Sequence, residues 1–207
     1  MSEAIQVVRG GDRELAARCA AGERAAQRLL FAEQKAVVHR TLYRILGGNR
    51  DVEDLVQESF LEIFRSIGGF RADAKLSTWV ASVAAHVAMA YLGRCRPASV
   101  SLDSVPDAPS GEPDALRRVM AREAMRRLYG ALAKVEVRQR TAFALHAIDG
   151  LPMAEVAAIM RASQVATRTR VSRARRAIEE HARRDSVLAE LVARALRGGG
   201  DGAGGDS

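Results

Sequence analysis

A chain of 207 residues with 48% hydrophobic residues is long enough for one large domain or two small ones with real cores. Aromatic residues make up only 4% and β-branched runs are absent, so the composition argues against a sheet-rich fold and predicts an all-α protein. The net charge of +7 and an isoelectric point near 10.2 point to a polyanion or an acidic protein surface as partner, with general solubility as the alternative.

The sequence also predicts where the protein works and what it does not bind. No apolar run approaches the ~18 residues of a membrane span, and the N-terminus lacks the apolar core of a signal peptide. Cys19 and Cys95 are far apart and lack metal-ligand spacing. We therefore expect a cytoplasmic protein without a membrane span, metal or cofactor, whose thiols are reduced.

The first half of the chain is predicted to be a helical domain spanning 12–96. Asp12 can cap its first helix, and a second helix follows a glycine-containing break. The last helix of this domain is expected to begin at Ser77 or Thr78 and to end at about Arg94.

An acidic amphipathic helix is predicted within this domain, beginning at Asn49 or Asp51. Asp54, Glu58 and Glu62 lie four residues apart, so like charges form one line, which is mildly destabilising in an isolated helix. In a protein of net positive charge, such a line favours a basic partner. The alternative is an ordinary core helix with a solvated acidic face.

A loop that mixes basic, hydroxyl and aromatic side chains follows the glycines that end the acidic helix, Gly68 and Gly69. Such a mixture suits a surface that binds unpaired bases. The alternative is that the aromatic residue at its end, Trp79, belongs to the core.

A flexible linker is predicted at 97–113, which holds four of the five prolines and no basic residue. Charge supports a domain boundary there. Residues 1–96 carry 14 basic and 11 acidic side chains, whereas residues 114–197 carry 18 basic and nine acidic ones. The basic excess therefore lies in the second domain.

The second domain, predicted at 114–184, ends in a helix-turn-helix: a short helix, a tight turn and a longer helix capped by Ser163. Six arginines and no acid lie between Arg161 and Arg176. A solvated helix usually mixes the signs of its charges, so this run fits a phosphate backbone and a major groove better. The alternative is an arginine-rich face that reflects composition. Residues 185–207 are expected to form a short helix packed on this domain and a disordered Gly-rich tail.

Two motifs resemble a known family. DVEDLVQESFLEIF resembles the D-x-E-D-L-V-Q-E-x-F helix of region two of sigma-70 family sigma factors, and FRADAKLSTWV resembles the F-R-x-x-x-x-F-x-T-W-L loop that follows it. LAKVEVRQRTAFALHAIDGLPMAEVAAIM and SQVATRTRVSRARRAI resemble region four. Two small domains joined by a short linker are similar to the extracytoplasmic-function (ECF) group, and the resemblance covers residues 12–180.

This resemblance implies a promoter-specificity subunit of bacterial RNA polymerase, which directs the core enzyme to promoters and promotes strand opening. The implied partners are the clamp helices of the largest subunit and the beta flap of the core enzyme, promoter DNA, and an anti-sigma factor. The implied core-binding residues are Asp51, Asp54, Gln57 and Glu58. The implied minus-ten element contacts are Phe70, Arg71, Lys75, Ser77, Thr78, Trp79 and His86. The implied minus-thirty-five element contacts are Ser163, Gln164, Arg168, Thr169, Arg170, Ser172, Arg173 and Arg176.

The chain departs from the family pattern at several positions. His86 and Ala90 stand where the family usually has Asn and Asp, which predicts a different minus-ten preference. Arg161 stands where the turn commonly has Gly, which predicts a less tight turn. Ala166 and Thr167 replace a usual Thr-Val pair, which predicts a weaker buried contact.

Two other classes of function explain the sequence less completely. A self-contained helix-turn-helix regulator with an N-terminal sensor domain explains the arginine-rich helix, but it does not explain an acidic helix joined to an aromatic loop. An enzyme is disfavoured, because the four histidines lie on separate predicted helices and no phosphate loop, metal-spaced cluster or nucleophile motif is present.

Overall fold

The computed structural model describes residues 2–47, 51–94, 115–183 and 185, and these residues form helices and turns without a strand. This confirms the predicted all-α class. The predicted linker at 97–113 and nearly all of 185–207 lie outside the described residues. The α-helices are α1 (Ser2–Ala20), α2 (Arg24–Leu46), α3 (Val52–Ser66), α4 (Leu76–Arg94), α5 (Ala115–Leu132), α6 (Val137–Phe143), α7 (Met153–Ile159) and α8 (Gln164–Ala182). A 3-10 turn, η1 (Ile67–Gly69), follows α3, and a π-helical turn, η2 (Ala144–Ile148), continues α6.

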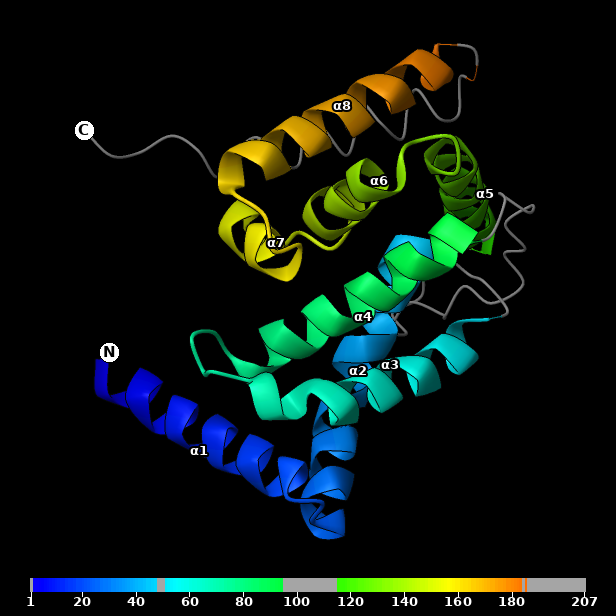
Figure 1. Cartoon of the computed structure of the whole chain (residues 1–207). Coiled ribbons are helices and arrows are strands. Elements are labelled where there is room, and N and C mark those ends of the chain that lie inside the picture. The colour runs from blue at the N-terminus through cyan, green and yellow to red at the C-terminus, as the bar shows by residue number, and fades with distance from the viewer. Residues whose placement is uncertain (1, 48–50, 95–114, 184, 186–207) are drawn as a thin grey trace.

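The first half of the chain is a helical bundle in which α2, α3 and α4 pack side by side, and α1 packs mainly on α2 and η1 at one end of the bundle (Figure 1). Fully buried side chains from the three packed helices, including Leu30, Leu42, Ile63 and Val80, form its core. Their spacing along each helix is the apolar periodicity that the sequence shows. The bundle fixes which face of α3 and of α4 remains exposed.

Asp12 caps a helix, but not the helix that the sequence predicts. α1 begins at Ser2, so Asp12 lies inside it. Its carboxylate Oδ2 instead accepts a hydrogen bond from the backbone N–H of Leu76, at 2.9 Å. Leu76 is the first residue of α4, and the free N–H groups of a first helical turn need such acceptors. The long-range partner was invisible in the sequence.

Helix α4 corrects the prediction that no segment has the length and apolarity of a membrane span. Leu76–Arg94 reaches that threshold by length and composition. Half of its apolar window is buried inside the protein, between α2 and α3 on one side and α7 on another. The apolarity of α4 therefore follows from its place at the centre of the packed helices.

The second half contains the predicted helix-turn-helix, α7 and α8. Ser163 caps α8, because its Oγ accepts a hydrogen bond from Ala166 N at 3.2 Å. Arg161 has a positive φ of 48°, in the left-handed region, and Ala162 N donates to Ala157 O at 2.9 Å. The predicted loosening of this turn is therefore wrong: the turn stays tight, and Arg161 adopts the conformation that glycine would accept more easily.

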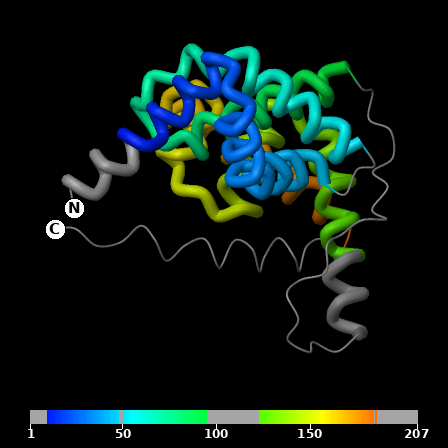
Figure 2. Tube along the Cα trace, turned by 90° about the horizontal axis from the view of Figure 1, so that it is seen from below, coloured from blue at the N-terminus to red at the C-terminus, as the bar shows by residue number. Residues whose placement is uncertain are grey.

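A joint of buried polar groups connects the two halves at the C-terminal end of α2. The Tyr129 hydroxyl donates to Arg44 O at 2.9 Å. Arg140 donates from Nε to Ile45 O at 3.0 Å and from Nη2 to Leu46 O at 3.2 Å. These bonds satisfy carbonyls that the end of a helix leaves without intrahelical partners. Both views show the described segments of the two halves packed together (Figures 1 and 2).

Candidate nucleic-acid and protein interfaces

The acidic helix α3 exposes the four residues assigned to core binding. Its apolar face is buried, so Asp51, Asp54, Gln57 and Glu58 all lie on the exposed side. This arrangement follows from the helical period, because the buried and exposed residues occupy opposite faces. The face is a row of carboxylates and one amide, which can accept hydrogen bonds and ion pairs from a basic protein surface.

The charges of this face are less isolated than the sequence suggests. Glu58 forms an ion pair with Arg94 at 3.3 Å, and Glu62 forms one with Arg65 at 2.7 Å. The Tyr91 hydroxyl donates a hydrogen bond to Asp51. The predicted line of like charges is therefore partly neutralised by the protein's own side chains. Exposed pairs of this kind contribute about 0–1 kcal/mol, so a partner's cations can replace the protein's own at little cost.

The predicted minus-ten contacts lie in the loop between α3 and α4 and on α4 itself. Phe70 and Trp79 pack edge to face with ring centroids 5.8 Å apart, and both are half-buried. Arg71 and Lys75 are exposed. The aromatic pair is therefore fixed against the bundle, while cations flank it in solvent.

The first turns of α4 lie close to the helix-turn-helix. Ser77 and Thr78 are half-buried, and the Thr78 hydroxyl lies 3.5 Å from a carboxylate oxygen of Glu155 on α7. His86 is exposed further along α4, with its Nδ1 2.6 Å from Ser82 O. Thus α7 covers part of the surface assigned to the minus-ten element.

Helix α8 buries one stripe and exposes most of the residues assigned to the minus-thirty-five element. Its buried residues are Thr167, Val171, Ala174, Ile178 and Ala182. Its exposed assigned residues, with the cap included, are Ser163, Gln164, Arg168, Thr169, Ser172, Arg173 and Arg176. A face of hydroxyl, amide and guanidinium groups can hydrogen-bond to base edges and to phosphates.

Arg170 and Thr167 differ from their neighbours on α8. Arg170 is half-buried, and its Nη1 atom is buried without a hydrogen-bond partner among the described residues. This guanidinium is therefore partly withdrawn from solvent, unlike the others assigned to phosphates. Thr167 is fully buried, and its hydroxyl donates to Ser163 O at 2.9 Å, so the polar group that replaces a valine is satisfied.

The side chains that could ligate a metal and the thiol of Cys19 are further reactive groups in the described part of the chain. No group of three His, Cys, Asp or Glu side chains there could hold a metal ion. Cys19 is 2% exposed, and burial raises the pKa of its thiol, which disfavours the reactive thiolate. Tyr129 and Arg140, which join the two halves, are not predictable from the sequence, because nothing local distinguishes them from other residues of an arginine-rich half.

Comparisons with known proteins agree with this arrangement. The sigma-70 region 2 family matches residues 30–96, which hold the acidic helix and its loop, and the sigma-70 region 4 family matches residues 125–178, which hold the helix-turn-helix. The chain therefore belongs to the ECF group of sigma-70 RNA polymerase sigma factors, whose members are promoter-specificity subunits.

Relatives match over most of their lengths. The ECF RNA polymerase sigma-E factor of Salmonella typhimurium is 32% identical over 178 residues, which cover 81% of this chain and 92% of that protein. The RNA polymerase sigma-H factor of Pseudomonas aeruginosa is 28% identical and is covered to 92%. The fold is similar to that of CnrH, solved with the cytosolic domain of CnrY, at a TM-score of 0.55 and 23% identity over 88% of this chain and 97% of that chain.

Proposed function

We propose that three surfaces of the chain bind three different partners during transcription initiation. The exposed face of α3 binds the clamp helices of the largest polymerase subunit. The α3–α4 loop and the exposed face of α4 bind the minus-ten element, and α8 binds the minus-thirty-five element. The observation that carries this proposal is the separation of charge: acidic groups are exposed on α3, and arginines are exposed on α8. One chain can therefore bind a basic protein surface and DNA at the same time.

The acidic residues of α3 form only weak ion pairs within the protein, which leaves them available to bind core polymerase. The side chains of Glu58 and Arg94 are 48% and 64% exposed, so their ion pair is solvated. Asp54, one helical turn before Glu58, is exposed as well. A rigid helix of a partner with several cations would gain interactions with Asp54, Gln57 and Glu58 together.

The side chains of the α3–α4 loop are suited to bind the unpaired strand that forms when the promoter opens. An aromatic pair fixed by Phe70 and Trp79 offers a platform for an unstacked base, and the exposed Arg71 and Lys75 can neutralise the adjacent phosphates. The remaining assigned contacts lie on α4: Ser77 and Thr78 are half-buried in its first turn, and His86 is exposed further along the helix.

Reading both elements at once requires the two halves to separate. The names of the elements place them about 25 base pairs apart, or about 85 Å of B-form DNA. In this structure α7 contacts α4 through Glu155 and Thr78. We infer that the closed arrangement is a form free of promoter DNA, and that the halves move apart when the polymerase places α4 and α8 on their elements.

The remaining assignments complete the proposal. The domains are 12–96 and 114–184, joined by 97–113, and the chain acts in the cytoplasm without catalytic chemistry of its own. The beta flap of the core enzyme is a second contact for the region 4 half. An anti-sigma factor is a further partner, as in the structure of the Bartonella quintana sigma factor RpoE with the anti-sigma factor NepR, which has a TM-score of 0.52 and 17% identity over 76% of this chain and 97% of that chain.

The test of core binding reverses charge on α3. Asp54→Lys combined with Glu58→Lys should weaken binding to purified core polymerase about tenfold or more, because attraction becomes repulsion at two contacts. A matched control is Glu14→Lys combined with Glu33→Lys, which changes the net charge equally at exposed sites on α1 and α2, outside the proposed surfaces. Fluorescence anisotropy measures the affinity, and circular dichroism checks that helicity is retained.

Two outcomes would contradict the proposal. Equal affinity of the test and control variants for core polymerase would support the alternative, in which α3 is an ordinary core helix with a solvated acidic face. Tight, sequence-specific binding of promoter DNA by the chain alone, without stimulation of run-off transcription by core polymerase, would instead support a self-contained regulator.

A further inference from the structure

Val165 is an apolar side chain in an unexpected place. It lies in the first turn of α8, and 73% of it is exposed, more than the other large hydrophobic side chains that are exposed on the described surface. Valine is also a poor choice for an exposed helical position, because its branched side chain loses rotamer freedom there. Neither packing nor helix propensity explains this residue.

Thr169 extends the apolar surface by one helical turn. Residues four apart on a helix lie on the same face, so Thr169 follows Val165 along α8. The Thr169 hydroxyl donates to the Val165 carbonyl oxygen at 3.0 Å, so its donor hydrogen is used inside the helix. What this exposed side chain offers a partner is therefore mainly its methyl group and an acceptor oxygen. Thr169 is one of the residues that the family resemblance assigns to the minus-thirty-five element, and this bond favours an apolar contact for it.

The surroundings of this apolar pair indicate what it contacts. Gln164 precedes Val165, and Arg168 lies one turn after it; both are exposed and polar. The N-terminal residues of a recognition helix meet base edges in the major groove. Among the four bases, only thymine presents an apolar group there, its C5-methyl group. An apolar pair between an amide and a guanidinium fits a thymine beside bases read by hydrogen bonds.

We propose that Val165, extended by the Thr169 methyl group, is a specificity-determining residue that recognises the C5-methyl group of one thymine in the minus-thirty-five element. This inference rests on the proposed DNA-binding role of α8 and adds the chemistry of one base position to it. Gln164 and Arg168 read the neighbouring bases, and Val165 excludes cytosine at its position, because cytosine has no methyl group and offers a donor that valine cannot accept.

The test removes single methyl groups from the DNA. Holoenzyme binding to a library of upstream elements first gives the preferred sequence. Each thymine of that sequence is then replaced by deoxyuridine, which lacks only the methyl group. We expect one replacement to weaken binding about threefold to fourfold, the effect of exposing one buried methyl group. In Val165→Ala the same replacement should have little effect, because only the Thr169 methyl group remains near the thymine, and Val165→Thr, which keeps one γ-methyl group, should retain more of the effect.

Matched variants separate the possible causes. Leu29→Ala removes another exposed apolar side chain, on α2, and should leave the deoxyuridine effect unchanged. Arg168→Ala should lower affinity and alter preference at a different base. A deoxyuridine effect that is largely lost only with Val165→Ala supports the proposal.

Other outcomes overturn it. If no thymine shows a methyl effect, or if Val165→Ala keeps the full effect, Val165 does not read thymine, even where Arg168→Ala confirms that α8 binds the element. If Val165→Ala weakens core binding without altering any methyl effect, the valine contacts a protein instead. If neither variant changes DNA binding, the assignment of α8 itself fails.

Discussion

Two arginines of the region 4 half have opposite environments. Arg140 on α6 is 5% exposed and donates hydrogen bonds to two backbone carbonyls at the end of α2. Arg168 on α8 is exposed. The same side chain closes a joint between the halves in one place and faces solvent in the other. Arginine content alone therefore overestimates how much of this half is available to DNA.

Close packing at the C-terminal end of α2 surrounds the buried Arg140. Gly47 has a positive φ of 75°, and a Cβ atom there would lie 3.0 Å from the Tyr129 ring. Only glycine fits both the conformation and the contact. Tyr129 and Arg140 thus approach the carbonyls at the end of α2 closely, and Asp149 forms an ion pair with Arg44 at 3.3 Å beside them. Burial lowers the pKa of the Arg140 guanidinium, but a guanidinium stays charged at neutral pH.

The largest expected effect comes from breaking the joint. Arg140→Met keeps an apolar stem of similar length but removes both donors, which leaves two carbonyls at the end of α2 without their partners. We expect the free energy of unfolding to fall by about 2–3 kcal/mol, since each buried unsatisfied acceptor costs about 1–3 kcal/mol and the loss of a desolvated charge offsets part of that. Urea unfolding followed by circular dichroism gives the value.

Arg138→Met is the matched control, because Arg138 is exposed on the same helix. Its stability should stay within about 0.5 kcal/mol of the wild type. If both variants unfold at the same urea concentration, Arg140 does not hold the halves together in solution.

The next effect should appear in DNA binding and not in stability. Arg168→Ala should cost about 1–3 kcal/mol on the preferred upstream element and relax preference at one base. Arg173→Ala should weaken all sequences alike and lower the salt slope by roughly one unit, because it contacts phosphate in our proposal. Holoenzyme binding to an element library at several salt concentrations distinguishes the two. An equal loss on every sequence for Arg168→Ala would contradict its role in reading bases.

The sequence predicted the helices and their exposed faces well, because both follow from periodicity within one segment. The acidic face of α3, the Ser163 cap and the buried stripe of α8 all depend on residues a few positions apart. What it could not predict depends on residues far apart in the chain. Asp12 caps α4 across 64 positions, and Arg140 reaches Ile45 across 95. No local pattern encodes such pairs.

The candidate sites follow the same rule. Exposure of the assigned acids and of most assigned arginines could be predicted from helical phase. The withdrawal of Arg170, the use of the Thr169 hydroxyl inside α8 and the contact of Thr78 with α7 could not, because each depends on rotamers or on the packing of the two halves. The turn at Arg161 shows a third case, in which packing imposes a backbone conformation that the residue itself disfavours.

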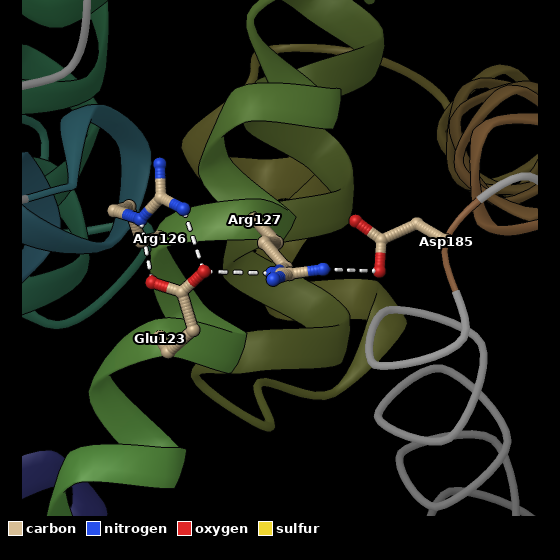
Figure 3. A network of polar contacts seen from close by, with 4 residues as sticks. All are labelled: Glu123, Arg126, Arg127 and Asp185. Carbon is tan, nitrogen blue, oxygen red and sulfur yellow. Dashed lines mark hydrogen bonds and ion pairs between the residues drawn. The ribbon is translucent and has the colours of Figure 1, made fainter.

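Two arginines on α5 are intermediate between buried Arg140 and exposed Arg168. The smallest of the predicted effects on stability concerns them. Arg126 and Arg127 both donate to Glu123, with shortest distances of 2.6 and 2.7 Å, and Arg127 also donates to Asp185 at 2.7 Å (Figure 3). Hydrogen bonds from the two guanidinium groups lower the pKa of the Glu123 carboxyl from 4.5 to about 2. The network joins α5 to the segment that follows α8, and it is solvent-accessible.

The sign of the pH dependence follows from this lowered pKa. A carboxyl group that binds its proton less tightly in the folded state stabilises that state above the unfolded pKa, near 4.5, and the stabilisation disappears as the pH falls towards 2. Glu123→Gln should therefore lower the melting temperature slightly at neutral pH, and the difference from the wild type should shrink between pH 5 and pH 2. In a background with Arg126→Gln and Arg127→Gln, the same substitution should have no pH-dependent effect. Thermal unfolding of the four proteins across this range measures the coupling, and a difference that stays constant with pH would show that the arginines do not hold the Glu123 carboxylate in solution.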